Sequence, residues 1–226
     1  MINVENLKKT YVSGDLRVEA LRGVQLNIGK GEFISIAGPS GSGKTTLLNI
    51  IGCIDTYDEG KVSIDGREIG KLSKLEKAEF RRKELGFIFQ SYNLIPVLTA
   101  YENVAFSLNL IGVKEKEIRE RSMALLKEVG LEGMEDRLPS KLSGGQQQRV
   151  AVARALIKNP KIILADEPTA NLDSRTGEEV LKIMLLMNER HQTTFIFSTH
   201  DKMVMDYAKR LVSLHDGRIV SDTLRS

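Results

Sequence analysis

The stretch GPSGSGKT, from Gly38 to Thr45, constrains the fold of this chain more than any other feature. It fits the pattern G-x-x-x-x-G-K-S/T, in which a lysine and a hydroxyl follow a glycine-rich turn. We expect Gly38, Gly41 and Gly43 to adopt positive φ and to let the backbone approach a ligand closely. Successive N–H groups of such a loop point inward and form an anion-binding concavity. The motif therefore predicts a site for the phosphates of a nucleotide.

The side chains at the end of this loop suit a nucleotide that carries Mg²⁺. Lys44 brings a positive charge to the β- and γ-phosphates, and Thr45 offers a hydroxyl to the metal ion. The segment FISIAG before the loop predicts a buried strand, and TTLLNIIGCI after it predicts a helix. The N-terminus of that helix favours phosphate. This order of strand, loop and helix argues against a chance glycine-rich turn.

Composition and charge fit a globular chain without a membrane span of its own. The 226 residues are 41% hydrophobic and 28% charged, with a net charge of +3. Acidic and basic residues are interspersed, and we expect no nucleic-acid partner. The N-terminus lacks an apolar signal core, and no apolar run reaches the ~18 residues that a bilayer span needs. We therefore expect a cytoplasmic protein that reaches a membrane only through a partner.

Periodicity along the chain predicts an α/β fold built as one domain with three parts. Residues 1–30 alternate with period two around a turn, which predicts an antiparallel β subdomain. Residues 91–141 carry helical patterns, with a capping box that starts at Thr99, and we expect an inserted helical subdomain. The ranges 1–90 and 142–226 complete a nucleotide-binding core with a mainly parallel sheet, because their apolar runs are typical of strands covered on both faces. The expected buried strands of this core are 33–38, 85–89, 161–165 and 193–198.

Polar residues follow two of these expected strands at the point where each strand ends. Asp166 and Glu167 come directly after one apolar run, and His200 follows another. The C-terminal ends of parallel strands are where α/β sheets bind ligands. One carboxylate there can hold Mg²⁺, and the next can orient and activate an attacking water. A neutral imidazole can donate one hydrogen bond and accept another, which suits a contact with the γ-phosphate.

The segment LSGGQ, residues 142–146, opens another expected helix. Ser143 is the expected N-cap, and Gly144 and Gly145 leave backbone amides exposed. This helix start is therefore a second position that favours an anion, far from the first in the sequence.

Together, GPSGSGKT, LSGGQ, IILADE and STHD strongly resemble the motifs of the ATP-binding-cassette (ABC) ATPases, over essentially the full length of the chain. The resemblance implies ATP and Mg²⁺ as cofactors, with Thr45, Gln90 and Asp166 at the metal. It implies Glu167 as the catalytic base, Gln90 as the glutamine that reaches the metal and the attacking water, and His200 as the switch histidine. The loop residues that it implies at the nucleotide are Gly38, Pro39, Ser40, Gly41, Ser42, Gly43, Lys44, Thr45 and Thr46.

The same resemblance implies further residues at the edges of the site. Tyr11 matches the aromatic residue that stacks on adenine, and residues 170–173 match the D-loop, which ends in Asp173. In this family two copies sandwich two ATP molecules head to tail, so a second copy is an implied partner. The residues that would contact the partner's nucleotide are Ser143, Gly144, Gly145 and Gln146.

Longer segments are similar to one branch of the family. GFIFQSYNLIPVLTAYENV, LSGGQQQRVAVARAL and LADEPTANLDS resemble the macrolide-efflux, lipoprotein-releasing and cell-division ATPases (MacB, LolD and FtsE types). This branch implies an ATPase on the inner face of the cell membrane that powers a separate permease, for export or release of a lipoprotein, peptide or drug. The alternative is a signalling ATPase that regulates cell-wall hydrolysis through its membrane partner without transport. A soluble cassette protein of DNA repair or translation would usually carry a long coiled-coil insertion or a second cassette, and the sequence shows neither.

Residues 91–98 are too apolar for a solvated linker. They either cover the core of the helical subdomain or form a groove that receives a short cytoplasmic helix of the permease. Leu94 is the position at which the two alternatives are expected to differ.

Overall fold

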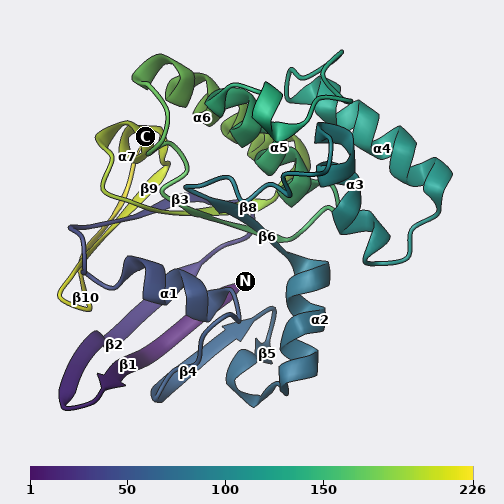
Figure 1. The fold of residues 1–226 in the computed structure, drawn as a ribbon. Helices are drawn as coiled ribbons and strands as arrows, with labels where there is room; N and C mark the ends of the chain where they lie inside the picture. The colour runs from purple at the N-terminus through teal and green to yellow at the C-terminus, as the bar shows by residue number, and fades with distance from the viewer. Residues whose placement is uncertain (226) are drawn as a thin grey trace.

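The computed structural model describes residues 1–225, which form two sheets with helices packed between and around them (Figure 1). The antiparallel sheet has the order β2-β1-β4-β5, and the larger sheet has the order β10-β9-β3-β8-β7-β6. The strands of the antiparallel sheet are β1 (Ile2–Ser13), β2 (Leu16–Ile28), β4 (Glu59–Ile64) and β5 (Arg67–Glu68). This arrangement confirms the expected α/β class with an N-terminal antiparallel part.

The larger sheet is parallel from β9 to β6, and β10 adds an antiparallel edge. Its strands are β3 (Phe33–Ala37), β6 (Leu85–Phe89), β7 (Ile162–Asp166), β8 (Thr194–Thr199), β9 (Arg210–His215) and β10 (Arg218–Leu224). Every residue of β3 and β8 is buried, as expected for parallel strands covered on both faces. The register pairs Ala37 with Thr199, Ser198 with Asp166, and Asp166 with Phe89, so the strands end together at one edge.

Side chains of the parallel strands divide between two hydrophobic cores because successive residues of a strand point to opposite faces. Phe195 and Phe197 belong to the core beneath the helices of the upper layer in Figure 1, whereas Ile196 belongs to the core shared with the antiparallel sheet. The first core is covered by α3 (Ala100–Asn109), α4 (Glu115–Glu128), α5 (Gly144–Leu156) and α6 (Ser174–His191). The second contains α1 (Lys44–Ile51), which lies between the sheets.

The remaining helical elements are α2 (Lys74–Glu84), α7 (Lys202–Tyr207) and the short 3₁₀ turns η1 (Ile69–Lys71) and η2 (Pro139–Lys141). The capping box expected at Thr99 is confirmed: its hydroxyl accepts from the backbone N–H of Glu102, whose carboxylate accepts from the N–H of Thr99. Ser143 caps α5 in the same way through Gln146. Such caps satisfy N–H groups that the first turn of a helix leaves without a partner.

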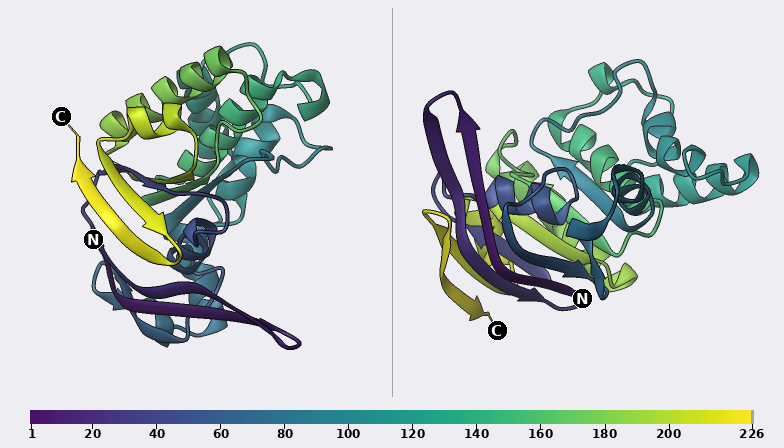
Figure 2. Two further views of the ribbon diagram at one scale, coloured as in Figure 1. Left: turned by 90° about the vertical axis from the view of Figure 1, so that its left-hand side faces the viewer. Right: turned by 90° about the horizontal axis from the view of Figure 1, so that it is seen from below.

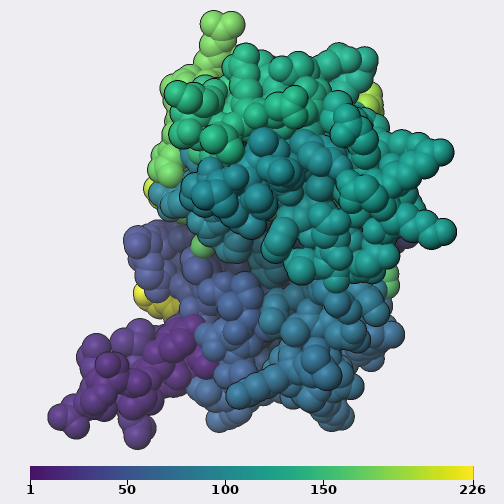
Figure 3. Space-filling view, turned by 45° about the vertical axis from the view of Figure 1, so that its right-hand side comes forward, coloured from purple at the N-terminus to yellow at the C-terminus, as the bar shows by residue number. Residues whose placement is uncertain are grey.

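The β1–β2 hairpin projects from the body of the molecule (Figures 2 and 3). Tyr11 and Val18 face each other across the two strands near the turn, and both are more than 40% exposed. Backbone pairing between β1 and β2 therefore holds the projecting part of the hairpin together, because the side chains near its tip are not buried.

Residues 91–98 are held against α3 by one buried side chain. Asn103 accepts from the N–H of Ile95 at 2.8 Å, and its amide donates to the carbonyls of Ile95, Leu98 and Thr99 at 2.9 to 3.2 Å. Leu94 packs against the first hydrophobic core. Of the two alternatives for residues 91–98, the structure therefore favours the one in which Leu94 covers the core.

We expect Asn103→Ala to lower the free energy of unfolding by about 2–3 kcal/mol, because it leaves the Ile95 N–H and the Leu98 carbonyl without the partner that the Asn103 side chain provides. Asn109→Ala, at an exposed position of the same helix, should change it by less than about 0.5 kcal/mol. Urea denaturation of the two variants measures both values. Equal effects would contradict the role given to Asn103.

Candidate nucleotide-binding site

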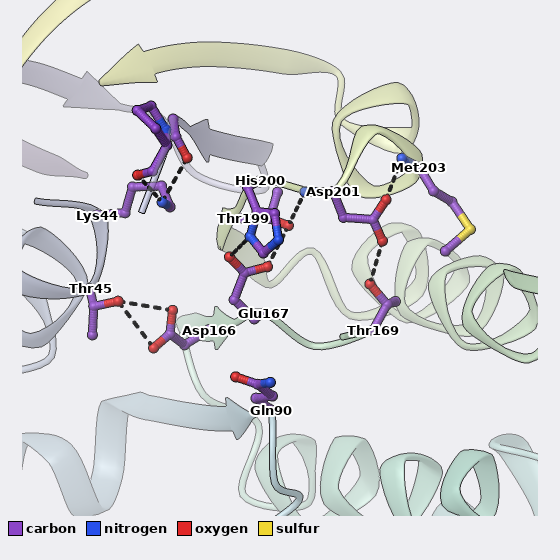
Figure 4. Close-up of polar contacts among 12 residues, drawn as sticks. Lys44, Thr45, Gln90, Asp166, Glu167, Thr169, Thr199, His200, Asp201 and Met203 are labelled. Atoms are coloured by element: carbon purple, nitrogen blue, oxygen red, sulfur yellow. Dashed lines mark hydrogen bonds and ion pairs between the residues drawn. The ribbon is translucent and has the colours of Figure 1, made fainter. Parts of the chain in front are cut away.

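A groove of about 490 Å³ opens where the parallel strands end. It runs from the β1–β2 hairpin over the phosphate loop to the ends of β6, β7 and β8. Figure 4 shows its side chains Lys44, Thr45, Gln90, Asp166, Glu167 and His200. The residues that line it are Tyr11, Val18, Ala20, Ser40, Gly41, Gly43, Lys44, Thr45, Thr46, Gln90, Asp166, Glu167 and His200. The fold thus brings most of the expected residues of one chain into one concave site.

The phosphate loop wraps around the ammonium group of Lys44. Its Nζ donates to the carbonyl oxygens of Gly38 and Pro39, at 2.8 and 2.9 Å. Burial lowers the pKa of Lys44, while the nearby carboxylates of Glu167 and Asp166 act in the opposite direction. Gly43 precedes α1 without a side-chain cap, so the first N–H groups of the helix remain free for an anion.

The three glycines of the loop serve two different needs. Gly41 and Gly43 have φ of +78° and +103°, as expected. The expectation of positive φ at Gly38 is wrong: a Cβ at this position would instead overlap the carbonyl oxygen of Leu214. The same substitution at Gly43 would overlap the carbonyl oxygen of Ala20. Close packing against β2 and β9 therefore demands glycine as strongly as backbone conformation does.

Thr45 and Asp166 meet across the groove (Figure 4). The hydroxyl of Thr45 lies 3.3 and 3.4 Å from the two carboxylate oxygens of Asp166. A hydroxyl and a carboxylate beside a phosphate loop are hard oxygen ligands of the kind that Mg²⁺ prefers, together with phosphate oxygens and waters. The donor set therefore fits the metal that the sequence implies. Gln90 enters the same groove from the end of β6.

Glu167 is fixed by bonds to backbone and side chain. Its φ is +45°, a conformation that glutamate rarely adopts, and its N–H donates to the carbonyl of Ser198 at 2.9 Å. One carboxylate oxygen lies 2.6 Å from Nδ1 of His200, and the other accepts from the hydroxyl of Thr199 at 2.8 Å. Since an ionised carboxylate only accepts, His200 donates from Nδ1 and directs Nε2 elsewhere.

Sequence reasoning gave no separate role to Thr199, which joins Glu167 to the start of α7. Besides binding Glu167, its hydroxyl accepts from the N–H of Asp201. Asp201 caps α7 through the N–H of Met203 and also accepts from the hydroxyl of Thr169 at 3.0 Å. The only local signal was that Thr199 and Asp201 flank the expected histidine at a strand end.

Tyr11 is oriented by Asp55, another residue that sequence reasoning missed. The phenol hydroxyl donates to Asp55 at 2.5 Å, and the ring remains 41% exposed at the groove. Burial raises the pKa of Tyr11, and the hydrogen bond to Asp55 adds to the rise. Nζ of Lys9 lies 5.0 Å from the ring centroid. No local pattern links Asp55 to Tyr11, because one lies after α1 and the other on β1.

Several expected residues do not line the groove of their own chain. Gly38 and Pro39 border a separate cavity beside it, and Ser42 is buried beneath the loop. Ser143 is exposed at the N-terminus of α5, and Asp173 is exposed as the N-cap of α6. A Cβ on Gly145 would overlap Thr176, and one on Gly144 would lie 2.8 Å from the Tyr92 hydroxyl, so both glycines allow close packing at the start of α5.

A strand, a phosphate loop and a helix beside paired strand-end acids define a P-loop nucleotide-binding protein. The chain matches the ABC transporter family over residues 21–170, and it belongs to that family. It is 47% identical over 225 residues to the macrolide export ATP-binding/permease protein MacB of Brucella melitensis, covering 100% of this chain and 35% of that protein. The chain spans about a third of the length of the MacB relatives it matches. These relatives confirm the expected MacB-like branch.

Relatives of similar length also match. An uncharacterized ABC transporter ATP-binding protein of Methanocaldococcus jannaschii, MJ0796, is 48% identical over 223 residues, covering 97% of this chain and 95% of that protein. A solved structure described as a dimeric, post-hydrolysis state of the ATP-binding cassette MJ0796 bound to ADP and Pi superposes with a TM-score of 0.91. It is 45% identical and covers 100% of both chains. The fold is therefore that of an ABC ATPase cassette.

We expect Gly43→Ala to weaken ATP binding about tenfold or more. The added methyl group clashes with the Ala20 carbonyl and strains a backbone at positive φ, and strain of ~1–3 kcal/mol corresponds to a change of this size. Gly14→Ala, at the hairpin tip with φ +59° and open space around it, is the control and should bind ATP as the wild type does. Calorimetric titration with ATP measures both, and normal affinity in Gly43→Ala would refute the steric argument.

Proposed function

We propose that this chain is the ATP-binding and ATP-hydrolysing subunit of a membrane ABC transporter. The observation that carries the proposal is the position of Glu167, bound by His200 and Thr199 in the same groove as Lys44, Thr45 and Asp166. This groove has a cation and free helix N–H groups for phosphate at one end and a fixed carboxylate at the other. Such an arrangement suits attack of water on a terminal phosphate.

The phosphate loop binds and orients the nucleotide in this proposal. Lys44 neutralises charge on the β- and γ-phosphates, and the N–H groups of Gly41 and of residues 43–46 donate hydrogen bonds to their oxygens, while the exposed ring of Tyr11 stacks on the adenine. Thr45, Asp166 and Gln90 hold Mg²⁺, which when bound neutralises charge on the β- and γ-phosphate oxygens. The geometry supports this metal site, because the Thr45 hydroxyl lies 3.3 and 3.4 Å from the two carboxylate oxygens of Asp166.

Glu167 is the general base. It orients the attacking water and accepts its proton as the oxygen bonds to the γ-phosphorus, while the bond to the bridging oxygen breaks to give ADP and phosphate. His200 donates to the carboxylate from Nδ1, so the neutral ring only accepts at Nε2, and the protonated ring donates there to an oxygen of the γ-phosphate. Gln90 lies across the groove, where its amide can orient the same water.

Two copies of the chain form the complete hydrolytic unit in this proposal. Ser143, Gly144, Gly145, Gln146 and Asp173 act on the nucleotide that the second copy binds. Support comes from their place outside the groove of their own chain and from the exposure of Ser143 and Asp173. The similar MJ0796 cassette is described as dimeric.

The membrane partner is a permease. The MacB relatives are named as joint ATP-binding and permease proteins, and this chain matches about a third of their length. Within residues 1–225 no helix combines the length and apolar character of a membrane span. We infer that the cassette works on the inner face of the membrane and powers export or release of a lipoprotein, peptide or drug. The MacB relatives favour this over a signalling ATPase without transport.

The permease would dock in a groove of about 420 Å³ beside β6. Phe87 and Phe89 form its apolar floor, with stacked rings 5.9 Å apart, and Ile54 is 51% exposed at its edge. Arg81, Arg82 and Lys158 line this floor with cationic side chains, of which Arg82 is paired with Glu79 at 2.9 Å and Lys158 has its pKa lowered to about 8 by burial. A short amphipathic helix with an acidic face fits such a surface. The groove lies on β6, which directly precedes Gln90. The sequence had instead suggested residues 91–98, which follow Gln90, as the docking segment.

Glu167→Gln tests the hydrolytic role. We expect ATP affinity to stay near the wild-type value while turnover falls ~10²–10⁴-fold, because the amide has the same shape but cannot accept the proton. The variant should also accumulate an ATP-bound dimer on gel filtration. Lys44→Ala is the complementary variant and should lose tight ATP binding. Turnover by Glu167→Gln at the wild-type rate would exclude Glu167 as the base.

Ile54→Glu tests the docking groove. A carboxylate on its exposed apolar edge should abolish co-purification with the permease while the ATPase rate of the isolated subunit stays within about twofold, since surface changes seldom perturb the fold. Val97→Glu is the matched control, because Val97 is 80% exposed and lies outside the groove. Permease binding that survives in Ile54→Glu, or that is lost equally in Val97→Glu, would count against this docking site.

A further inference from the structure

The loop that follows Gln90 contains two consecutive residues in the left-handed region. Tyr92 has φ of +59° and Asn93 has φ of +49°. Asparagine tolerates this region, but tyrosine rarely adopts it. Two such residues in sequence persist only where the surrounding structure holds them, and positions of this kind gather at functional sites.

One guanidinium group holds both of these residues. Arg154 donates from Nη2 to the carbonyl of Tyr92 at 2.7 Å and from Nη1 to the carbonyl of Asn93. The two parallel N–H donors of arginine match two carbonyls turned to the same side, which a lysine cannot reproduce. Arg154 lies on α5, more than 60 residues further along the chain.

No ion pair with a carboxylate accounts for the half-buried position of Arg154 within residues 1–225. Within residues 1–225 it forms no ion pair, and burial, with no opposing charge, lowers its pKa. A guanidinium remains charged in spite of this. A half-buried cation is costly unless polar groups satisfy it, and here the carbonyls of Tyr92 and Asn93 do so.

The same loop joins Gln90 to the D-loop. The side-chain amide of Asn171 donates to the Gln90 carbonyl at 3.0 Å, and Gln90 Nε2 lies 3.5 Å from Asn171 Oδ1. The Tyr92 hydroxyl donates to the Asn171 carbonyl at 3.4 Å and lies beside Gly144 at the start of α5. Gln90 is thus attached to a loop whose conformation depends on α5 at two points.

We propose that Arg154 is a positioning residue that fixes Gln90 in the nucleotide groove by holding the carbonyls of Tyr92 and Asn93. The proposal rests on the ATPase function proposed above. α5 carries Ser143 to Gln146 at one end and Arg154 near the other. A single helix therefore connects two sets of residues. One set faces the nucleotide of the second copy, and the other positions Gln90 at the nucleotide of the same chain.

Arg154→Lys tests this role. The lysine keeps the charge and can bind only one carbonyl well, so the loop should relax and kcat should fall about tenfold, a loss typical of a misplaced polar group. ATP affinity should stay near the wild-type value, because Arg154 does not touch the nucleotide groove. Arg121→Lys is the matched control: Arg121 also donates to a backbone carbonyl, that of Ile157, but does not contact this loop. Its kcat should be unchanged.

A double-mutant cycle separates positioning from a general structural role. In a Gln90→Ala background, Arg154→Lys should lower kcat by less than about twofold, because the side chain it positions is gone. The full tenfold loss in both backgrounds would overturn the proposal. So would an unchanged kcat in Arg154→Lys when the wild type hydrolyses ATP normally. A wild type without ATPase activity would instead refute the proposed function.

A second pair of variants leaves the hydrophobic cores unchanged, because Asn93 is exposed. Asn93→Val places a β-branched residue at φ +49° and should disturb the loop with Arg154 in place, whereas Asn93→Gly accepts that conformation. We expect kcat to fall about tenfold in the valine variant only. Amide hydrogen exchange of residues 91–94 should accelerate in Asn93→Val and Arg154→Lys alike. Equal kcat in the valine and glycine variants, or unchanged exchange, would overturn the proposal.

Discussion

The register of the parallel sheet is the constraint on which the site depends. β3, β8, β7 and β6 pair so that Ala37, Thr199, Asp166 and Phe89 end at one edge. The residues that directly follow these strand ends are Gly38 of the phosphate loop, His200, Glu167 and Gln90. Because side chains alternate between faces, a slip of one residue would turn a whole strand's apolar set away from its core. The two cores therefore fix the register, and the register brings the polar ends together.

Polar contacts stabilise the strained backbone that lies beside this edge. Glu167 has positive φ and is held by the Ser198 carbonyl, His200 and Thr199. Tyr92 and Asn93 have positive φ and are held by Arg154. In both cases the hydrogen bonds come from segments distant in sequence. The rigid sheet and α5 thus supply the geometry that the connecting loops could not maintain by themselves.

Local patterns predicted much of this fold because they depend on residues a few positions apart. The burial of β3 and β8, the capping box at Thr99, the N-cap at Ser143 and the hairpin at the N-terminus follow from periodicity and cap chemistry. The error at Gly38 has a physical cause. A glycine can be required by φ or by a close neighbour, and the sequence does not show that the Leu214 carbonyl lies against it.

The sequence alone determined which chemical groups this protein carries and at which strand ends they lie: the cation of Lys44, the carboxylates of Asp166 and Glu167, and the helix starts at Gly43 and Ser143. The tertiary structure decided which groups meet. It paired Tyr11 with Asp55, packed Leu94 against the core, and brought Arg154 to the carbonyls of Tyr92 and Asn93. The local sequence shows that a hydrogen-bonding group is present. Which partner it meets depends on strand order and helix packing, because these join segments that no local pattern relates.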